Sequence, residues 1–205
     1  IQEKSFPVVM SGRDIVGIAQ TGTGKTFAYL LPILRVLPFS EQKAPRVMIV
    51  VPTRELVVQV AGEIEKLTKY MSVRIAAVYG GGNINIQRQT VYNGCDIVVG
   101  TPGRLMDLHY DRSLPFHSIQ KLVIDEMDEM LNLGFRPQLM NILDTLPPKR
   151  QNILYSATLD EEVEVIIHEF FNTPVYVEIV SRGTPLEKIN QGLYEAPNFR
   201  TKVNL

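Results

Sequence analysis

Apolar residues gather in short runs along this chain, and turn or helical patterns separate one run from the next. Several runs are almost continuously apolar and rich in β-branched residues, as expected of strands that are covered on both faces. These runs predict strands at DIVGIA (14–19), RVMIVV (46–51), VRIAAV (73–78), CDIVVG (95–100), KLVID (121–125), QNILYSA (151–157) and PVYVEI (174–179).

The segments between these predicted strands carry apolar residues at helical spacing. The clearest are KTFAYLLPILRVL (25–37), RELVVQVAGEIEKLTKY (54–70), MNILDTL (140–146) and EEVEVIIHEFF (161–171). Strands that alternate with helices indicate an α/β fold, with a mostly parallel sheet of about seven strands and helices on both faces. We expect Pro32 to kink the first of these helices.

The composition is that of an ordinary globular protein, because 45% of the 205 residues are apolar and 21% are charged. No apolar run is long enough to span a membrane and no secretion leader is visible, so we expect no membrane partner. Cys95 is the only cysteine, which excludes an internal disulfide framework, indicates a buried, structural thiol and favours a reducing, intracellular and cytoplasmic setting. A net charge of -1 gives no sign of a nucleic-acid partner, so such a function must rest on local sites.

The stretch AQTGTGKT (19–26) follows the first predicted strand and opens the first predicted helix. Its glycines allow backbone N–H groups to turn toward one anion, and the helix directs its positive end to the same point. Lys25 would then hold the outer phosphates of a nucleotide, and Thr26 would offer its hydroxyl to Mg²⁺. Ala19 stands where the phosphate-loop pattern has its first glycine, and we expect it to end the strand rather than touch phosphate. The alternative is a glycine-rich surface turn.

The apolar strand KLVID ends in two adjacent acids. Asp125, at the strand end, is suited to hold Mg²⁺, as the second motif of phosphate-loop proteins requires. Glu126 is then placed to orient and deprotonate water, which favours hydrolysis over transfer to a second substrate. The alternative for such an acidic stretch is a solvated surface. Lys25, Asp125 and Glu126 are therefore the candidate catalytic residues.

With these residues identified, the sequence resembles the DEAD-box ATP-dependent RNA helicases, specifically their N-terminal RecA-like domain. The similarity extends over nearly the whole chain. It rests on an ordered series of motifs: IQ (1–2), AQTGTGKT (19–26), PTREL (52–56), GG (81–82) with Gln87, TPGR (101–104), DEMD (125–128) and SAT (156–158). Such an ordered series is far more specific than any one of its members.

The resemblance implies roles that spacing alone does not assign. Gln2 matches the glutamine that reads adenine, so ATP with Mg²⁺ is the expected ligand. Nucleotide contacts are expected from Gln2, Thr21, Gly22, Thr23, Gly24, Lys25 and Thr26, with Mg²⁺ held by Thr26 and Asp125. The positions that match those along the RNA backbone are Pro52, Thr53, Arg54, Gly81, Gln87, Thr101, Gly103 and Arg104. Ser156 and Thr158 match a segment that hydrogen-bonds with Asp128 and couples the nucleotide site to strand separation.

The sequence departs from the family pattern in two places. Met127 replaces the alanine of the DEAD motif, and we expect it to be tolerated because both acids are retained. The sequence also begins at the end of the adenine-reading motif, without the aromatic residue that precedes it in the family. We expect adenine affinity to suffer.

The resemblance also predicts how the chain is divided. We expect residues 1–180 to form the helicase domain and residues 181–205 to be a linker and the start of a second RecA-like domain. In the family, that second domain carries arginines that reach the γ-phosphate and raise the rate by about 10³ to 10⁵. No HRxGRxxR pattern occurs in this sequence, so the chain alone is expected to bind nucleotide, hydrolyse ATP feebly and unwind nothing. The expected partners are RNA, the second domain and protein cofactors.

The sequence leaves other functions open. A DNA-directed helicase or translocase has similar motifs, and a nucleotide-dependent RNA clamp is a non-enzymatic alternative that the intact acids and Lys25 disfavour. A nucleotide kinase is disfavoured because no lid or acceptor site is apparent. His109, His117 and His168 have no carboxylate or cysteine at ligand spacing, so we expect no zinc site.

Overall fold

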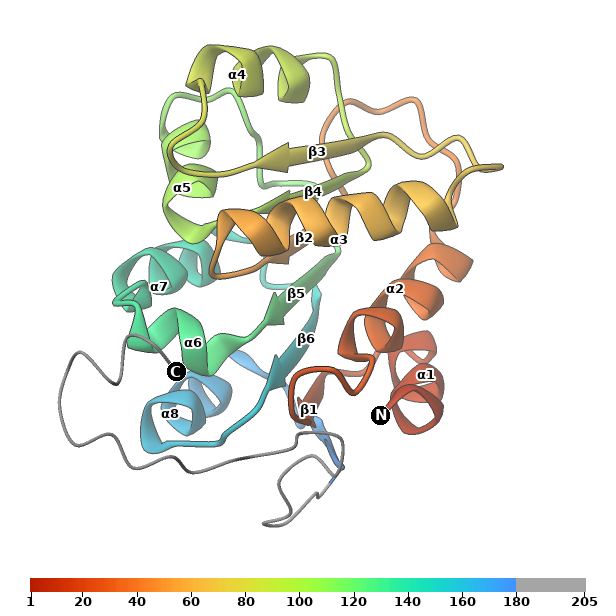
Figure 1. The fold of residues 1–205 in the computed structure, drawn as a ribbon, viewed down its shortest axis with the longest axis vertical. Coiled ribbons are helices and arrows are strands. Elements are labelled where there is room, and N and C mark those ends of the chain that lie inside the picture. The colour runs from red at the N-terminus through yellow and green to blue at the C-terminus, as the bar shows by residue number, and fades with distance from the viewer. Residues whose placement is uncertain (180–205) are drawn as a thin grey trace, which may run out of the picture.

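A computed structural model of the chain describes residues 1–179, and the predicted linker at 181–205 lies outside the described residues. The fold is built on a seven-stranded parallel sheet with the order β3-β4-β2-β5-β6-β1-β7 (Figure 1). Every predicted strand is confirmed, within two residues of its predicted bounds. The strands are β1 (Ile15–Ile18), β2 (Val47–Val50), β3 (Ile75–Val78), β4 (Ile97–Gly100), β5 (Lys121–Asp125), β6 (Gln151–Ser156) and β7 (Val175–Glu178).

Helices connect the strands, and the four that the apolar spacing indicated correspond to α2, α3, α7 and α8. The helices are α1 (Gln2–Met10), α2 (Lys25–Val36), α3 (Arg54–Leu67), α4 (Ile84–Tyr92), α5 (Pro102–Tyr110), α6 (Met127–Asn132), α7 (Arg136–Thr145) and α8 (Glu161–Phe170). The apolar pattern did not reveal α1, which contains Pro7, or α4, which buries only Gln87 and Val91. Helix α2 continues through the buried Pro32 to Val36.

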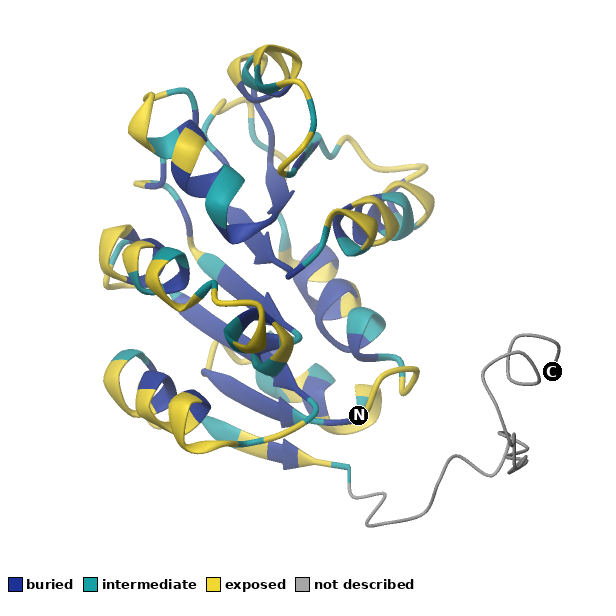
Figure 2. Ribbon diagram, turned by 60° about the vertical axis from the view of Figure 1, so that its left-hand side comes forward, coloured by how far each residue is buried: buried dark blue, intermediate teal, exposed yellow. Residues whose placement is uncertain are grey.

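Two hydrophobic cores lie on opposite faces of the sheet. Helices α1, α2 and α3 pack on one face against strand residues such as Ile49, Val99 and Val123. The other face, with Met48 and Val98, packs against the remaining helices α4 to α8. Successive strand residues point to opposite faces, so strands buried on both sides are almost continuously apolar. Figure 2 shows this burial as dark strands inside partly exposed helices.

The parallel arrangement brings the sequence motifs to one edge of the sheet. The loops that follow β1, β2, β4, β5 and β6 all begin at the carboxyl edge, where ligands of open α/β sheets bind. Asp125 in β5 and Gly17 in β1 both pair with Tyr155 of the intervening strand β6, so they lie at one level. A side chain at position 17 would collide with the Tyr155 ring, which explains the glycine there.

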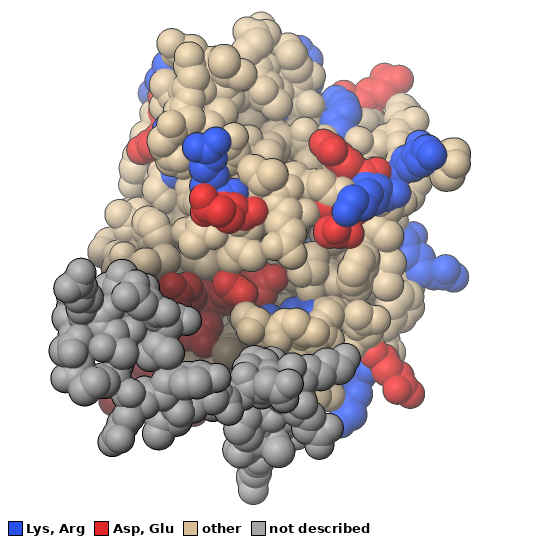
Figure 3. Space-filling view, in the orientation of Figure 1, with Lys and Arg blue, Asp and Glu red and all other residues tan. Residues whose placement is uncertain are grey.

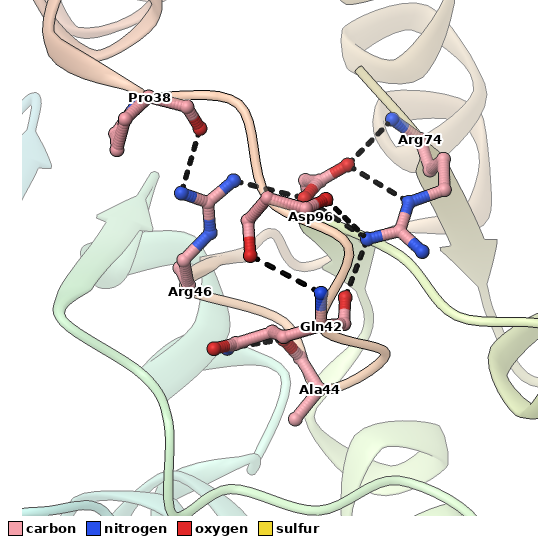
Figure 4. A network of polar contacts seen from close by, with 7 residues as sticks. Pro38, Gln42, Ala44, Arg46, Arg74 and Asp96 are labelled. Carbon is pink, nitrogen blue, oxygen red and sulfur yellow. Dashed lines mark hydrogen bonds and ion pairs between the residues drawn. The ribbon is translucent and has the colours of Figure 1, made fainter. Parts of the chain in front are cut away.

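A buried ion-pair network braces the opposite edge (Figure 4). Asp96 accepts hydrogen bonds from Arg46 at 2.9 Å and from Nε of Arg74 at 3.1 Å. Arg46 also donates to the Pro38 carbonyl oxygen at 2.7 Å. Burial acts to raise the pKa of Asp96, but hydrogen bonds from Arg74 and Arg46 outweigh it and hold that pKa below its usual range. The network fastens the loop before β2 to the starts of β3 and β4.

Candidate nucleotide site and nucleic-acid interface

The loop between β1 and α2 has the backbone geometry that its glycines predict. Gly22 and Gly24 adopt left-handed conformations, with φ values of 81° and 84°, which side chains other than glycine rarely accept. Gly24 also forms the N-cap of α2. Ala19 is 2% exposed, and its N–H donates to the Ser156 carbonyl oxygen at 3.0 Å. Ala19 therefore continues the sheet contact one residue beyond β1, and its lack of contact with phosphate remains a prediction.

A pocket of about 440 Å³ lies beside this loop. The structure brings to it the predicted residues Thr21, Gly22, Gly24, Lys25, Thr26, Asp125 and Glu126. Five further residues, Phe27, Leu56, Gln59, Val60 and Glu63, complete the wall. Most of these belong to α3, which no local motif connects with the loop. In Figure 3, acidic side chains gather in a hollow near the middle of this face.

Two buried charges of opposite sign line this pocket with unused polar atoms. Lys25 and Asp125 are each 6% exposed. Within residues 1–179, Nζ of Lys25 and Oδ1 of Asp125 have no hydrogen-bond partner. Buried polar atoms without partners are costly, and in native proteins they are rare. The pair is therefore suited to a ligand that offers both negative oxygens and a cation.

Asp125 has a second oxygen, and this one is held by the protein. The buried Tyr29 hydroxyl donates to Oδ2 of Asp125 at 3.1 Å. Burial raises the pKa of Asp125 to about 6, whereas the Lys25 charge and the Tyr29 hydroxyl act to lower it and the Glu126 charge acts to raise it. The sequence did not identify Tyr29 as a residue of this site, because Tyr29 lies within the apolar pattern of a buried helix and belongs to no motif.

Glu126 has an unusual backbone conformation. It has φ 57° and ψ 52°, a left-handed conformation, and it is the N-cap of α6. Such a conformation costs a residue other than glycine of order 1–3 kcal/mol, and conformations of this kind cluster at functional sites. The next residue, Met127, is fully buried in the core on the α4 to α8 face. The longer side chain in place of alanine thus has packing space there.

Two predicted nucleotide residues brace the loop and are not part of the pocket wall. The Gln2 side-chain amide donates to the Gly24 carbonyl oxygen at 3.2 Å, which connects α1 to the loop. The Thr23 hydroxyl donates to the Gln20 carbonyl oxygen at 2.7 Å. Contact of Gln2 with adenine remains a prediction.

The predicted RNA-contacting residues form one neighbourhood around the Tyr79–Gly82 loop and the starts of α3 and α5. The Arg54 guanidinium lies over the Tyr79 ring, 4.9 Å from its centroid. Nη1 of Arg104 donates to Oε1 of Gln87 at 2.9 Å and to the Gly82 carbonyl oxygen at 3.3 Å. Two arginines from different helices thus lie against the same loop.

Burial divides this predicted set into two groups. Pro52, Gln87 and Thr101 are buried, whereas Thr53, Arg54, Gly81, Gly103 and Arg104 are half-buried or exposed. The Gln87 amide bonds both the N–H and the carbonyl oxygen of Tyr79, each at 3.1 Å. The Thr101 hydroxyl accepts from the Gly80 N–H at 3.4 Å. In this conformation, these buried polar side chains shape the loop, and their contact with RNA remains a prediction.

The predicted contacts between Asp128 and the SAT segment are present. Oδ2 of Asp128 accepts from the N–H of Ala157, the N–H of Thr158 and the Thr158 hydroxyl, each at 3.2 Å. The Ser156 hydroxyl accepts from the Asp128 N–H at 3.3 Å. One carboxylate therefore joins the start of α6 to the turn after β6. The coupling role of this connection remains a prediction.

The three histidines and Cys95 lie outside the pocket beside the glycine loop. His109 stacks on Phe116 with ring centroids 4.2 Å apart, whereas His117 and His168 are exposed. In the described part of the chain, no three His, Cys, Asp or Glu side chains come close enough together to hold a metal ion. None of the helices described is long and apolar enough to cross a membrane. Cys95 is 1% exposed, in agreement with a structural thiol.

Comparison with known proteins gives a consistent set of relatives. The sequence model of a family described as DEAD/DEAH box helicase matches residues 1–166. A DEAD-box ATP-dependent RNA helicase CshA from Streptococcus pneumoniae is 39% identical over 93% of this chain and 36% of its own length. DEAD-box ATP-dependent RNA helicase 24 from Oryza sativa is 40% identical over 99% of this chain and 27% of its own length.

A solved structure agrees with these relatives. The crystal structure of a hypothetical ATP-dependent RNA helicase from Sulfolobus tokodaii superimposes with a TM-score of 0.80 at 37% identity. The match covers 87% of this chain and 51% of that one. The chain therefore spans about a third or less of these two curated relatives and half of the solved one.

Proposed function

The chain belongs to the DEAD/DEAH box helicase family, and we propose that it is the ATP-binding RecA-like domain of an RNA helicase. In this proposal it binds Mg-ATP in the pocket beside the glycine loop and contacts single-stranded RNA along the Tyr79–Gly82 loop. Together with a second RecA-like domain, it would couple ATP hydrolysis to local strand separation or to remodelling of RNA–protein complexes. The observation that carries the proposal is the pair of buried, unused atoms on Lys25 and Asp125 in one pocket.

The residues present fit a magnesium nucleotide. Lys25 would bind the outer phosphates, because its ammonium lines the pocket without a partner among the described residues. Thr26 and Asp125 would hold Mg²⁺, which prefers oxygen ligands. Mg²⁺ bound there would neutralise charge on the β- and γ-phosphates. The left-handed glycines leave the loop backbone free to approach them closely.

Glu126 is the proposed general base. Glu126 lines the same pocket and follows Asp125 directly, so its carboxylate would orient and deprotonate a water molecule beside a bound nucleotide. The strained backbone of Glu126 supports this role, because strain at one residue persists only where the surrounding structure enforces it. Arg54 and Arg104 would contact RNA phosphates through their guanidinium groups, without reading bases.

Nucleotide titration of the 205-residue chain tests the first part of this proposal. Isothermal titration with Mg-ADP is expected to show one site, and Lys25→Ala should weaken it by about tenfold to a hundredfold. Lys69→Ala is the matched control, because Lys69 is exposed and lies outside the pocket wall. Equal affinities for all three proteins would remove the proposed phosphate role of Lys25.

The enzymatic part requires a protein that also contains the second RecA-like domain. Its ATP hydrolysis is expected to be stimulated by single-stranded RNA more than by DNA of the same sequence, since the family is expected to grip 2′-hydroxyls. Glu126→Gln should abolish turnover while nucleotide binding persists. Turnover that survives this substitution would reject Glu126 as the base, and stimulation by DNA alone would favour a DNA-directed translocase.

A further inference from the structure

A second polar pocket, of about 900 Å³, opens at the amino edge of the sheet. We call it the basic pocket and define it by Asp14, Lys121, Lys149, Arg150, Asn152 and Asn172, which lie in its wall. Strand β5 begins at Lys121 and ends at Asp125 in the nucleotide site. These two positions are about 13 Å apart along an extended strand, so one phosphate cannot occupy both sites.

The three cations of the basic pocket have no acidic partners. Among the described residues, none of Lys121, Lys149 and Arg150 lies within ion-pair distance of a carboxylate. Arg150 donates only to neutral oxygens: the Asn152 side chain at 2.8 Å and the carbonyls of Leu146 and Pro147 at 3.3 and 2.9 Å. Lys121 donates to the side-chain oxygen of Gln151. Their positive charges therefore remain uncompensated at close range.

Asp14, the acid in this wall, is occupied by other groups. One of its oxygens accepts from the Asn152 N–H at 2.7 Å. The other accepts from the Asn152 side-chain amide at 3.1 Å and from the Asn172 N–H at 2.8 Å. Asp14 thus fastens the starts of β1 and β6 to the turn after α8, and it leaves the cations unpaired. The wall as a whole carries two more positive than negative charges.

Two of the three cations are also partly removed from water. Lys121 and Arg150 are half-buried, and burial lowers the pKa of each, with Asp14 and Asp144 opposing this effect at Arg150. A desolvated cation without a counter-ion is unfavourable, and an anion bound beside it would remove that cost. Arg150 is held in place by its three neutral acceptors, so little side-chain entropy would be lost on binding.

We propose that the basic pocket binds a phosphate group, held by Lys121, Lys149 and Arg150. Two excess positive charges match one phosphate monoester dianion or two neighbouring phosphodiester groups, and guanidinium and ammonium groups are the usual protein partners of both. The pocket is much larger than one phosphate ion, so the natural ligand carries the group on a larger body. That body is either a small phosphorylated molecule or the backbone of an RNA strand.

The test is a site-resolved titration of the ¹⁵N-labelled 205-residue chain at constant ionic strength. One arm uses inorganic phosphate, and the other uses a single-stranded RNA without terminal phosphates. Saturable shifts are expected for the backbone amides of Lys121, Gln151 and Asn172. Separate shifts at Gly22 and Gly24 would report the nucleotide site and do not count toward the basic pocket. Lys121→Gln and Lys149→Gln should each weaken binding by about tenfold.

Lys69→Gln is the control variant, because Lys69 is exposed, two residues beyond the end of α3, and lies outside the basic pocket. Lys149 is exposed too, so its substitution leaves the fold intact even if Lys121→Gln perturbs it. Binding of phosphate alone identifies a small ligand, and tighter binding of RNA identifies a strand backbone. Shifts confined to Gly22 and Gly24, shifts that survive both variants, or equal binding of a polyglutamate peptide would overturn the proposal.

Discussion

The Tyr29 hydroxyl donates a hydrogen bond of 3.1 Å to Oδ2 of Asp125, which connects the second turn of α2 to the end of β5. Both side chains are buried, and the Tyr29 ring lies 5.7 Å from that of Tyr155. The contact holds the carboxylate by one oxygen, and the other oxygen has no hydrogen-bond partner within residues 1–179. Tyr29 is therefore a positioning residue for the proposed metal ligand.

We expect Tyr29→Phe to weaken Mg-dependent nucleotide binding. The lost donor stabilised the ionised carboxylate, so the pKa of Asp125 should rise further above its present value of about 6. The carboxylate must then lose a more tightly held proton to accept Mg²⁺, and the loss of affinity should be larger at pH 6 than at pH 8. The substitution should also reduce the free energy of unfolding by about 1–2 kcal/mol. Isothermal titration at both pH values and denaturant unfolding measure these effects.

Tyr155→Phe is the matched control for that substitution. Tyr155 is equally buried, but its hydroxyl has no hydrogen-bond partner within residues 1–179. Removal of a buried hydroxyl without a partner is expected to be neutral or stabilising. If both phenylalanine variants weaken nucleotide binding alike, the effect comes from packing and the positioning role of Tyr29 is wrong.

Asp128→Ala is expected to loosen the turn after β6. Three donors on Ala157 and Thr158 lose their common acceptor, so amide hydrogen exchange at these two residues should accelerate. Nucleotide affinity of the chain should change little, because Asp128 is outside the pocket wall. In a protein with both domains, strand separation per ATP hydrolysed should fall. Unchanged exchange at Thr158 would show that other contacts hold the turn.

Asp96→Asn is expected to reduce the free energy of unfolding by about 3–5 kcal/mol, because it leaves the buried Arg46 without its counter-ion. Arg74→Gln should cost about 1 kcal/mol or less, since the Arg74 side chain is 37% exposed and can be hydrated. The pKa of Asp96 is lowered in the fold, so its contribution is present above the ordinary pKa of aspartate and is lost as pH falls through the lowered value. Urea unfolding measures all of these changes.

Asp111→Asn provides the control for the buried pair. Asp111 forms an ion pair with Arg88 at 2.6 Å, but both side chains are partly exposed. Its loss should cost less than about 1 kcal/mol. A similar cost for the Asp96 and Asp111 variants would mean that burial does not set the strength of the Asp96 network.

The single thiol should be unreactive in the folded chain. Burial raises the pKa of Cys95 to about 12, with the Asp96 charge adding to the effect and Arg74 opposing it. At pH 8 the thiolate fraction is then about a thousandfold lower than in the unfolded chain. Because the pKa is raised in the fold, stability is unaffected below the ordinary thiol pKa and falls as pH rises toward about 12. The rate of reaction with an aromatic disulfide reagent, with and without denaturant, measures this; rapid labelling of the folded chain would contradict it.

The sequence by itself determined the strands, the fold class and the glycine loop. Strands such as Val47–Val50 are covered on both faces, so their burial is visible as a local apolar run. The loop is equally local, because the left-handed backbone at Gly22 and Gly24 strongly favours glycine at those positions. Helices with weak apolar faces, such as α4, were not predicted from the apolar spacing, because few of their residues enter the core.

Only the tertiary structure decided which distant groups meet. Tyr29 reaches Asp125 from another element, and Asp96 joins Arg46 and Arg74 across the starts of three strands. Gln87 is buried and supports the Tyr79–Gly82 loop through two hydrogen bonds to Tyr79. No local motif encodes this placement. The physical reason is that propensity and periodicity act over neighbouring residues, whereas desolvation and hydrogen bonding depend on contacts between residues far apart in the sequence.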